Sequence, residues 1–94
     1  MKQCVIITIQ GKVQGVGYRK YAQKYAQQFS IEGIVQNCED KNKVIIKACG
    51  QSADLDSFID LLYKGTPTSR VDEILVEPLL QEKNFREVFR IIGD

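Results

Sequence analysis

Residues 11–19 read Gly11-Lys12-Val13-Gln14-Gly15-Val16-Gly17-Tyr18-Arg19, and they connect a β-branched apolar run to a helical pattern. The three glycines of this stretch allow positive φ and let backbone N–H groups approach a ligand without an intervening Cβ. Arg19 lies where the helix begins, and a cation there opposes the helix dipole unless an anion is bound nearby. The stretch therefore predicts a strand–loop–helix junction that binds an anion with several negatively charged oxygens.

Length and composition indicate an ordinary globular chain. The 94 residues predict one domain over residues 1–94, and 44% of them are hydrophobic. A net charge of +1 argues against a general nucleic-acid binder, although the charged residues up to Ser30 are all basic and concentrate positive charge around the loop. The longest apolar run, 4–9, is too short to span a bilayer and has no cleavage site behind it. We therefore expect a cytoplasmic chain that binds neither nucleic acid nor membrane.

The three cysteines are Cys4, Cys38 and Cys49, an odd count with no Cys-x-x-Cys spacing. Each lies in or beside an apolar strand pattern. The sequence thus predicts free buried thiols in preference to a disulfide or a metal site.

Apolar periodicity predicts seven elements along the chain. Strands are expected over residues 3–10, 31–36, 44–49, 71–76 and 88–92, and helices over 18–29 and from the N-cap Ser52 to Gly65. The polar turn at 38–43 closes a hairpin in which Asn42 is expected to adopt a left-handed conformation.

This order, βαββαβ with a short extra strand, predicts two split βαβ units that form an open sheet with both helices on one face. The crossover through the first helix makes the strands at 3–10 and 31–36 run in the same direction. Asn37, at the end of the second of these strands, should therefore lie at the same sheet edge as the loop at 11–19.

Several known types of phosphate-binding loop can be excluded for residues 11–19. A cysteine phosphatase needs its nucleophile six residues before the arginine, where this chain has Val13. A phosphate loop of the form GxxxxGK[ST] is absent, and a GxGxxG dinucleotide motif fails at Lys20. No Ser, Thr, Asp, His or Cys lies between Gln10 and Arg19, and the whole chain contains no histidine. The nucleophile of any reaction at this loop is therefore water.

Without a histidine or carboxylate at the loop, no general base or acid is evident. The site therefore either only binds an anion or cleaves a substrate that needs no acid or base from the protein. A mixed carboxylic–phosphoric anhydride is such a substrate, because its carboxylate leaving group departs without a proton. The planar fork of Arg19 would hold two phosphate oxygens. Asn37 is the candidate for orienting the attacking water. Alternatively, Asn37 is only a turn residue at the end of a strand. The phosphate would also be held by the backbone amides of Gln14, Gly15, Val16, Gly17 and Tyr18.

Residues 11–19 resemble the acylphosphatase signature G-x-V-Q-G-V-x-F-R, and Gly33-Ile34-Val35-Gln36-Asn37 resembles the second signature of that family, G-aromatic-V-x-N. The resemblance implies a ferredoxin-like α/β sandwich of the α+β class that hydrolyses acyl phosphates without a metal or cofactor. It assigns phosphate binding to Arg19 and orientation of the attacking water to Asn37. The expected partners are a small acyl phosphate and inorganic phosphate as product inhibitor, and the chain is expected to act as a monomer.

Three positions depart from the family pattern. Tyr18 replaces the usual Phe and adds a hydroxyl expected to reach solvent or the loop, Ile34 replaces an aromatic residue, and the turn at 38–43 is longer. The role of the Gln14 side chain stays open. The rival interpretation is a non-catalytic module of the same fold, which binds a regulatory ligand or RNA or only assembles through an edge strand. The strand at 3–10 lacks the exposed aromatics that an RNA-binding sheet uses.

Overall fold

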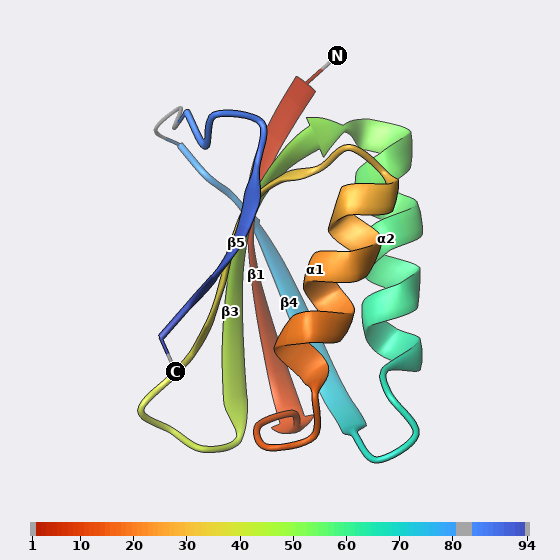
Figure 1. Ribbon diagram of the computed structural model, residues 1–94, viewed down its shortest axis with the longest axis vertical. Helices are drawn as coiled ribbons and strands as arrows, with labels where there is room; N and C mark the ends of the chain where they lie inside the picture. Colours follow the sequence, from red (N-terminus) through yellow and green to blue (C-terminus); the bar gives the residue numbers. More distant parts are fainter. Residues whose placement is uncertain (1, 81–83, 94) are drawn as a thin grey trace.

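The computed structural model describes residues 2–80 and 84–93 (Figure 1). The predicted order of elements is confirmed, with boundaries that move by one or two residues for most of them. The elements are β1 (Lys2–Lys12), α1 (Tyr18–Gln28), β2 (Glu32–Asn37), β3 (Lys43–Gln51), α2 (Ser52–Lys64), β4 (Arg70–Pro78) and β5 (Phe89–Ile92).

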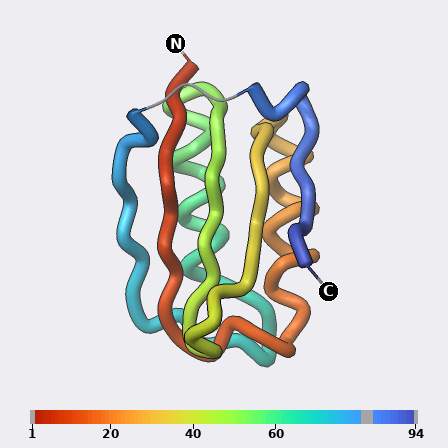
Figure 2. The backbone as a smooth tube through the Cα atoms, turned by 90° about the vertical axis from the view of Figure 1, so that its left-hand side faces the viewer, coloured from red at the N-terminus to blue at the C-terminus, as the bar shows by residue number. Residues whose placement is uncertain are grey.

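The strands form one sheet in the order β4-β1-β3-β2-β5, with both helices packed against the same face (Figure 1). Figure 2 shows the strands side by side in this order with the helices behind them. All strand pairs are antiparallel except β2 with β5. Because β3 is antiparallel to both β1 and β2, these two strands run in the same direction, and the predicted sandwich with two helices on a mostly antiparallel sheet is confirmed.

The core lies between the sheet and the helices. Alternate residues of β1 and β3 point toward the helices and are fully buried, as period-two side-chain placement requires. Ala22 and Ala26 are small, which lets α1 approach the sheet closely, whereas α2 contributes the larger Leu55, Phe58 and Leu62. The sheet residues of this core include Ile7, Ile9, Val35, Val44, Ile46 and Ala48. Neither helix, within the described part of the chain, is long and apolar enough to cross a membrane.

Gly11 is part of the β-sheet and not of the anion-binding loop in which the sequence pattern placed it. The pairing of β1 with β4 shifts register between Gln10 and Gly11. A Cβ on Gly11 would lie 2.0 Å from the carbonyl oxygen of Arg70, and its φ of +147° is rare for other residues. This bulge lets β1 continue to Lys12 and deliver the chain into the loop.

The hydroxyl of Tyr18 reaches neither solvent nor the loop, contrary to expectation. It is buried and donates a hydrogen bond of 2.8 Å to the carbonyl oxygen of Leu62 in α2. Burial raises the pKa of this phenol, which stays protonated and therefore remains a donor. Tyr21 makes a parallel contact to the carbonyl oxygen of Leu61 at 2.6 Å. The two tyrosines thus connect the start of α1 to the last turns of α2.

The prediction of free thiols is wrong for two of the three cysteines. Cys4 and Cys49 face each other in the β1–β3 register and form a disulfide with an S–S distance of 2.02 Å, while Cys38 is free. Directly opposed residues of antiparallel strands bring their Cβ atoms close enough for such a bond. Sequence spacing alone carries no information on this register.

Two local predictions are also corrected. Asn42 does not have positive φ; its N–H instead donates to Oδ1 of Asp40 at 2.9 Å, and this bond shapes the turn. Ser52 is the first helical residue, because the N-cap position is occupied by Gln51 and no side chain caps the helix there.

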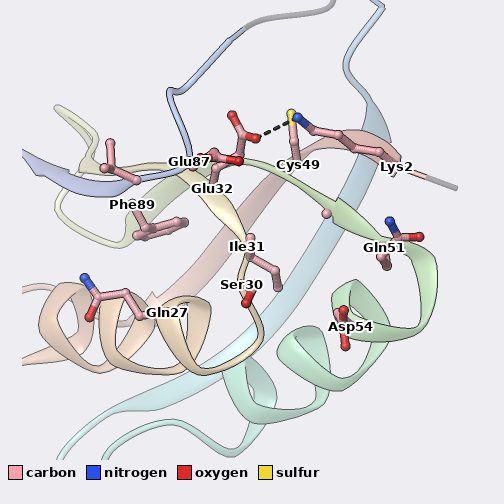
Figure 3. A pocket seen from close by; sticks show the side chains of 12 residues that line it. Lys2, Gln27, Ser30, Ile31, Glu32, Cys49, Gln51, Asp54, Glu87 and Phe89 are labelled. Carbon is pink, nitrogen blue, oxygen red and sulfur yellow. Dashed lines mark hydrogen bonds and ion pairs between the residues drawn. The ribbon is translucent and has the colours of Figure 1, made fainter.

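A polar cluster closes the end of the sheet remote from the β1–α1 loop. Glu32 is buried, and its carboxylate accepts hydrogen bonds from Nζ of Lys2 at 2.6 Å and from the N–H of Phe85 at 2.8 Å. These bonds lower the pKa of Glu32, with the Lys2 bond as the largest cause. Figure 3 shows the pair at the margin of a cavity of about 600 Å³ that Cys49 and Asp54 also line.

We expect Tyr18→Phe to lower the free energy of unfolding by about 1–3 kcal/mol, because the carbonyl of Leu62 loses its buried donor. Urea unfolding measures this change. Tyr63→Phe is the matched control, because Tyr63 is 52% exposed and the loss of its hydroxyl should lower the free energy of unfolding by less than about 0.5 kcal/mol. Equal stabilities of the wild type and Tyr18→Phe would contradict the contribution of this bond.

Glu32→Gln should destabilise the fold by roughly 1–2 kcal/mol at neutral pH, since it removes a charged acceptor from Lys2 and Phe85. The folded-state pKa of Glu32 lies below its usual 4.5, so its contribution is present above that pH and is lost as the pH falls through the folded-state value. Unfolding free energies of wild type and variant should therefore converge in acid. A gap that stays constant down to pH 3 would contradict the charge-based account, and Glu39→Gln in the exposed turn should show no such gap.

Candidate active site

The loop between β1 and α1 has the predicted open backbone. Gly15 and Gly17 have φ of +72° and +74°, a left-handed conformation that favours glycine, and both are exposed. Gly17 is the N-cap of α1, and it makes no side-chain capping bond; the first turn carries no acidic residue. The N–H groups at this helix start are therefore available to an anion rather than to a capping carboxylate or hydroxyl.

The sides of the loop are held by contacts from two directions. The carbonyl oxygen of Val16 accepts hydrogen bonds from Oγ1 of Thr66 at 3.2 Å and of Thr68 at 3.5 Å, both in the segment after α2. The side chain of Gln14 points away from the helix start, toward the β2–β3 turn. The loop thus keeps its shape through polar contacts that leave its glycines exposed.

Arg19 lies in the first turn of α1 and is half-buried. Its Nη1 donates a hydrogen bond of 3.1 Å to the carbonyl oxygen of Ile92, the last residue of β5. This contact orients the guanidinium from a strand that lies 73 residues further along the chain. Sequence reasoning did not anticipate that β5 takes part, because nothing in residues 89–92 marks them as neighbours of the loop.

Asn37 is the last residue of β2 and pairs with Val44 of β3. Its Oδ1 is buried, and no hydrogen-bond donor among the described residues reaches it. A buried amide oxygen without a partner costs free energy, and native structures keep such groups where a function requires them. This observation favours a functional role for Asn37 over that of an ordinary turn residue.

Arg19 and Asn37 line one cavity of about 280 Å³ together with Gly15 and Gly17. The predicted sharing of one sheet edge is therefore confirmed at the level of side chains. The cavity also includes Val13, Tyr18, Lys20 and Ile91. Of the predicted loop residues, Gln14 and Val16 do not line it.

The electrostatics of this cavity suit an anion. Two of its lining residues, Arg19 and Lys20, are cationic, and none of them is acidic. Burial raises the pKa of the neighbouring Cys38 thiol, which therefore stays protonated and is a poor nucleophile. Across residues 2–80 and 84–93, no group of three or more His, Cys, Asp or Glu side chains is placed to hold a metal ion.

Comparison with known proteins identifies the family of the chain. The family model of acylphosphatases matches residues 5–91. An acylphosphatase from Clostridium acetobutylicum is 37% identical, over 95% of this chain and 100% of that relative. The crystal structure of acylphosphatase from Bacillus subtilis has a TM-score of 0.90 at 32% identity and covers 99% of this chain and 100% of its own. HypF from T. kodakarensis, at a TM-score of 0.83 and 30% identity, covers 100% of this chain but only 12% of its own.

The match therefore includes both the strand–loop–helix junction with Arg19 and the end of β2 with Asn37, which are the two parts that the cavity brings together. The similarity to the Clostridium and Bacillus proteins extends over essentially the full length of each. The chain belongs to the acylphosphatase family, whose members are hydrolases that act on acid anhydrides.

Proposed function

We propose that the chain hydrolyses the carboxyl–phosphate bond of acyl phosphates to a carboxylate and inorganic phosphate, and that Arg19 and Asn37 divide the work of binding and water orientation. The observation that carries the proposal is the cavity that Arg19, Asn37 and the loop glycines Gly15 and Gly17 line together. Membership of the family supports the activity, and the geometry supports the division of roles.

In this proposal the phosphate is bound by charge and by backbone donors. Arg19 presents a planar guanidinium, which matches two phosphate oxygens, and its contact with Ile92 limits the orientations that it can take. The remaining oxygens accept hydrogen bonds from backbone N–H groups of the loop, of whose residues Gly15, Gly17 and Tyr18 line the cavity, in the manner typical of helix starts and glycine-rich loops. Since these donors are in place before the substrate arrives, the developing negative charge is stabilised with little reorganisation.

Asn37 orients the attacking water. Its side-chain amide, at the lining of the cavity, hydrogen-bonds the water and holds it so that a lone pair of the water oxygen faces phosphorus. The water oxygen bonds to phosphorus, the bond from phosphorus to the acyl oxygen breaks, and its electron pair leaves with the carboxylate. The proton of the water passes to a phosphate oxygen of the substrate. No protein acid or base is needed, which agrees with a cavity lined by no carboxylate or histidine.

The proposed reaction uses no cofactor. The ligands of the chain are a small acyl phosphate, as substrate, and inorganic phosphate, the product, which competes for the same hydrogen-bond donors. The chain is proposed to act as a monomer. A module that only binds a ligand would have no need of Arg19 and Asn37 together at one cavity.

We expect the wild type to hydrolyse benzoyl phosphate at a rate that a metal chelator does not change, and Asn37→Ala to reduce kcat by roughly a hundred- to thousand-fold, the usual effect of losing one such positioned group. Binding of inorganic phosphate should be largely retained. Asn42→Ala is the matched control, because it removes an exposed asparagine from the neighbouring turn. No turnover above spontaneous hydrolysis by the folded wild type would leave a binding site only.

Arg19→Ala should abolish phosphate binding, because the guanidinium is the half-buried cation of the cavity. Two measurements report this loss: inhibition of any residual hydrolysis by inorganic phosphate, and the increase in thermal stability that phosphate gives the wild type. Lys24→Ala removes the same charge one turn further along α1 and should leave both unchanged. Unaltered phosphate protection in Arg19→Ala would refute the assignment.

A further inference from the structure

The side chain of Gln14 makes an unusual set of contacts for a residue of the β1–α1 loop. Its Nε2 lies 3.0 Å from the carbonyl oxygen of Cys38, 3.1 Å from that of Asp40 and 2.8 Å from that of Lys43. The partners lie 24 to 29 residues further along the chain. Three carbonyl oxygens of the β2–β3 turn therefore converge on one amide group of the loop.

The turn that receives these contacts is otherwise held mostly by its own polar bonds. The N–H of Cys38 donates to the carbonyl of Lys43 at 3.1 Å, and the N–H of Lys43 donates to the carbonyl of Asp40 at 3.1 Å. Residues 39–42 are exposed, so they contribute little apolar burial. From the β1 side, the N–H of Gly11 donates to the carbonyl of Asn42 at 2.9 Å. The turn thus takes its position relative to the loop from polar contacts of this kind.

The two ends of the Gln14 contact adjoin the two halves of the cavity. Gln14 directly precedes Gly15, which lines the cavity on the loop side. Cys38 directly follows Asn37, which lines it on the β2 side. The bond from Gln14 to the Cys38 carbonyl therefore spans from the phosphate-binding loop to the residue next to the water-orienting amide.

We propose that the side chain of Gln14 is a positioning residue, which sets the place of Asn37 relative to the phosphate-binding loop. The inference rests on the role proposed above for Asn37. It assigns to Gln14 an effect on the attack of water rather than on phosphate affinity, because the loop amides and Arg19 remain when the side chain is changed.

The chemistry of the contact explains why glutamine fits this position. A primary amide brings two N–H donors to a place where three acceptors converge. A glutamate of the same size would direct a carboxylate at the three carbonyl oxygens, and a methionine would offer no donor. In either case the part-buried carbonyls of Cys38 and Lys43 lose the hydrogen bonds from Gln14, and the turn is held less firmly against the loop. A shift of about 1 Å in a group that positions a reactant can cost about a hundred-fold in rate.

Gln14→Met tests the proposal in the full chain, with benzoyl phosphate as substrate and inorganic phosphate as the probe of binding. We expect kcat to fall by about ten-fold or more while the inhibition constant of phosphate stays within about two-fold. Gln23→Met is the matched control, since Nε2 of Gln23 donates to the carbonyl of Phe89 at 3.0 Å and that contact joins α1 to β5. It should lose a similar cross-link and keep kcat within about two-fold.

Two outcomes would overturn the inference. If kcat of Gln14→Met stays within two-fold of the wild type, the side chain has no positioning role. If kcat and phosphate affinity fall together, Gln14 shapes the phosphate site and does not act through Asn37. Should Gln14→Met fail to fold, Gln14→Asn keeps a neutral amide on a side chain one methylene shorter, too short to reach the turn in the same way, and is expected to show the same loss of kcat with retained phosphate binding.

Asn37→Ala, measured in parallel, separates this inference from the proposed function. Full turnover of Asn37→Ala would refute the role of Asn37 itself. Loss of turnover in Asn37→Ala together with an active Gln14→Met would refute only the role of Gln14. Hydrogen exchange of the N–H groups of Cys38 and Lys43 gives a direct readout, since both should exchange faster in Gln14→Met but not in Gln23→Met.

Discussion

The pairing of β3 with β1 on one side and with β2 on the other is the constraint on which the site depends. Because β3 runs antiparallel to both neighbours, β1 and β2 end at the same edge of the sheet. The chain leaves β1 into the glycine loop and leaves β2 at Asn37, so one sheet edge receives both the loop proposed to bind phosphate and the amide proposed to orient water. The strands that build the core thereby bring Arg19 and Asn37 to one cavity.

The site is assembled from backbone donors and a small number of long-range polar contacts. Ile92 orients Arg19, Thr66 and Thr68 hold the carbonyl of Val16, and Gln14 reaches the β2–β3 turn. Each contact places a group before the substrate binds. The proposed reaction, whose leaving group needs no proton, requires positioning and charge stabilisation, and contacts of this kind are suited to both.

The opposite end of the molecule has a different character. The disulfide between Cys4 and Cys49 and the buried ion pair of Glu32 with Lys2 lie near the start of β1 and the end of β3, remote from the loop. These interactions join strands and connect the segment around Phe85 to the sheet. Stabilising contacts thus gather where no open backbone is needed, and the exposed glycines and the unpartnered amide oxygen gather at the active edge.

The amino-acid sequence by itself determined the elements and the sandwich fold, because apolar periodicity is a local signal, and it singled out Arg19 and Asn37, which the structure places at one cavity. The sequence pattern placed Gly11 in the anion-binding loop, whereas Gly11 lacks a Cβ because the backbone of Arg70 approaches it closely. It also missed the hydrogen-bond partner of the Tyr18 hydroxyl. Only the tertiary structure decided the Cys4–Cys49 disulfide, the contact of β5 with Arg19 and the reach of Gln14 to the turn. Each of these joins residues far apart in the chain, and their meeting depends on strand register and packing, which no short stretch of sequence encodes.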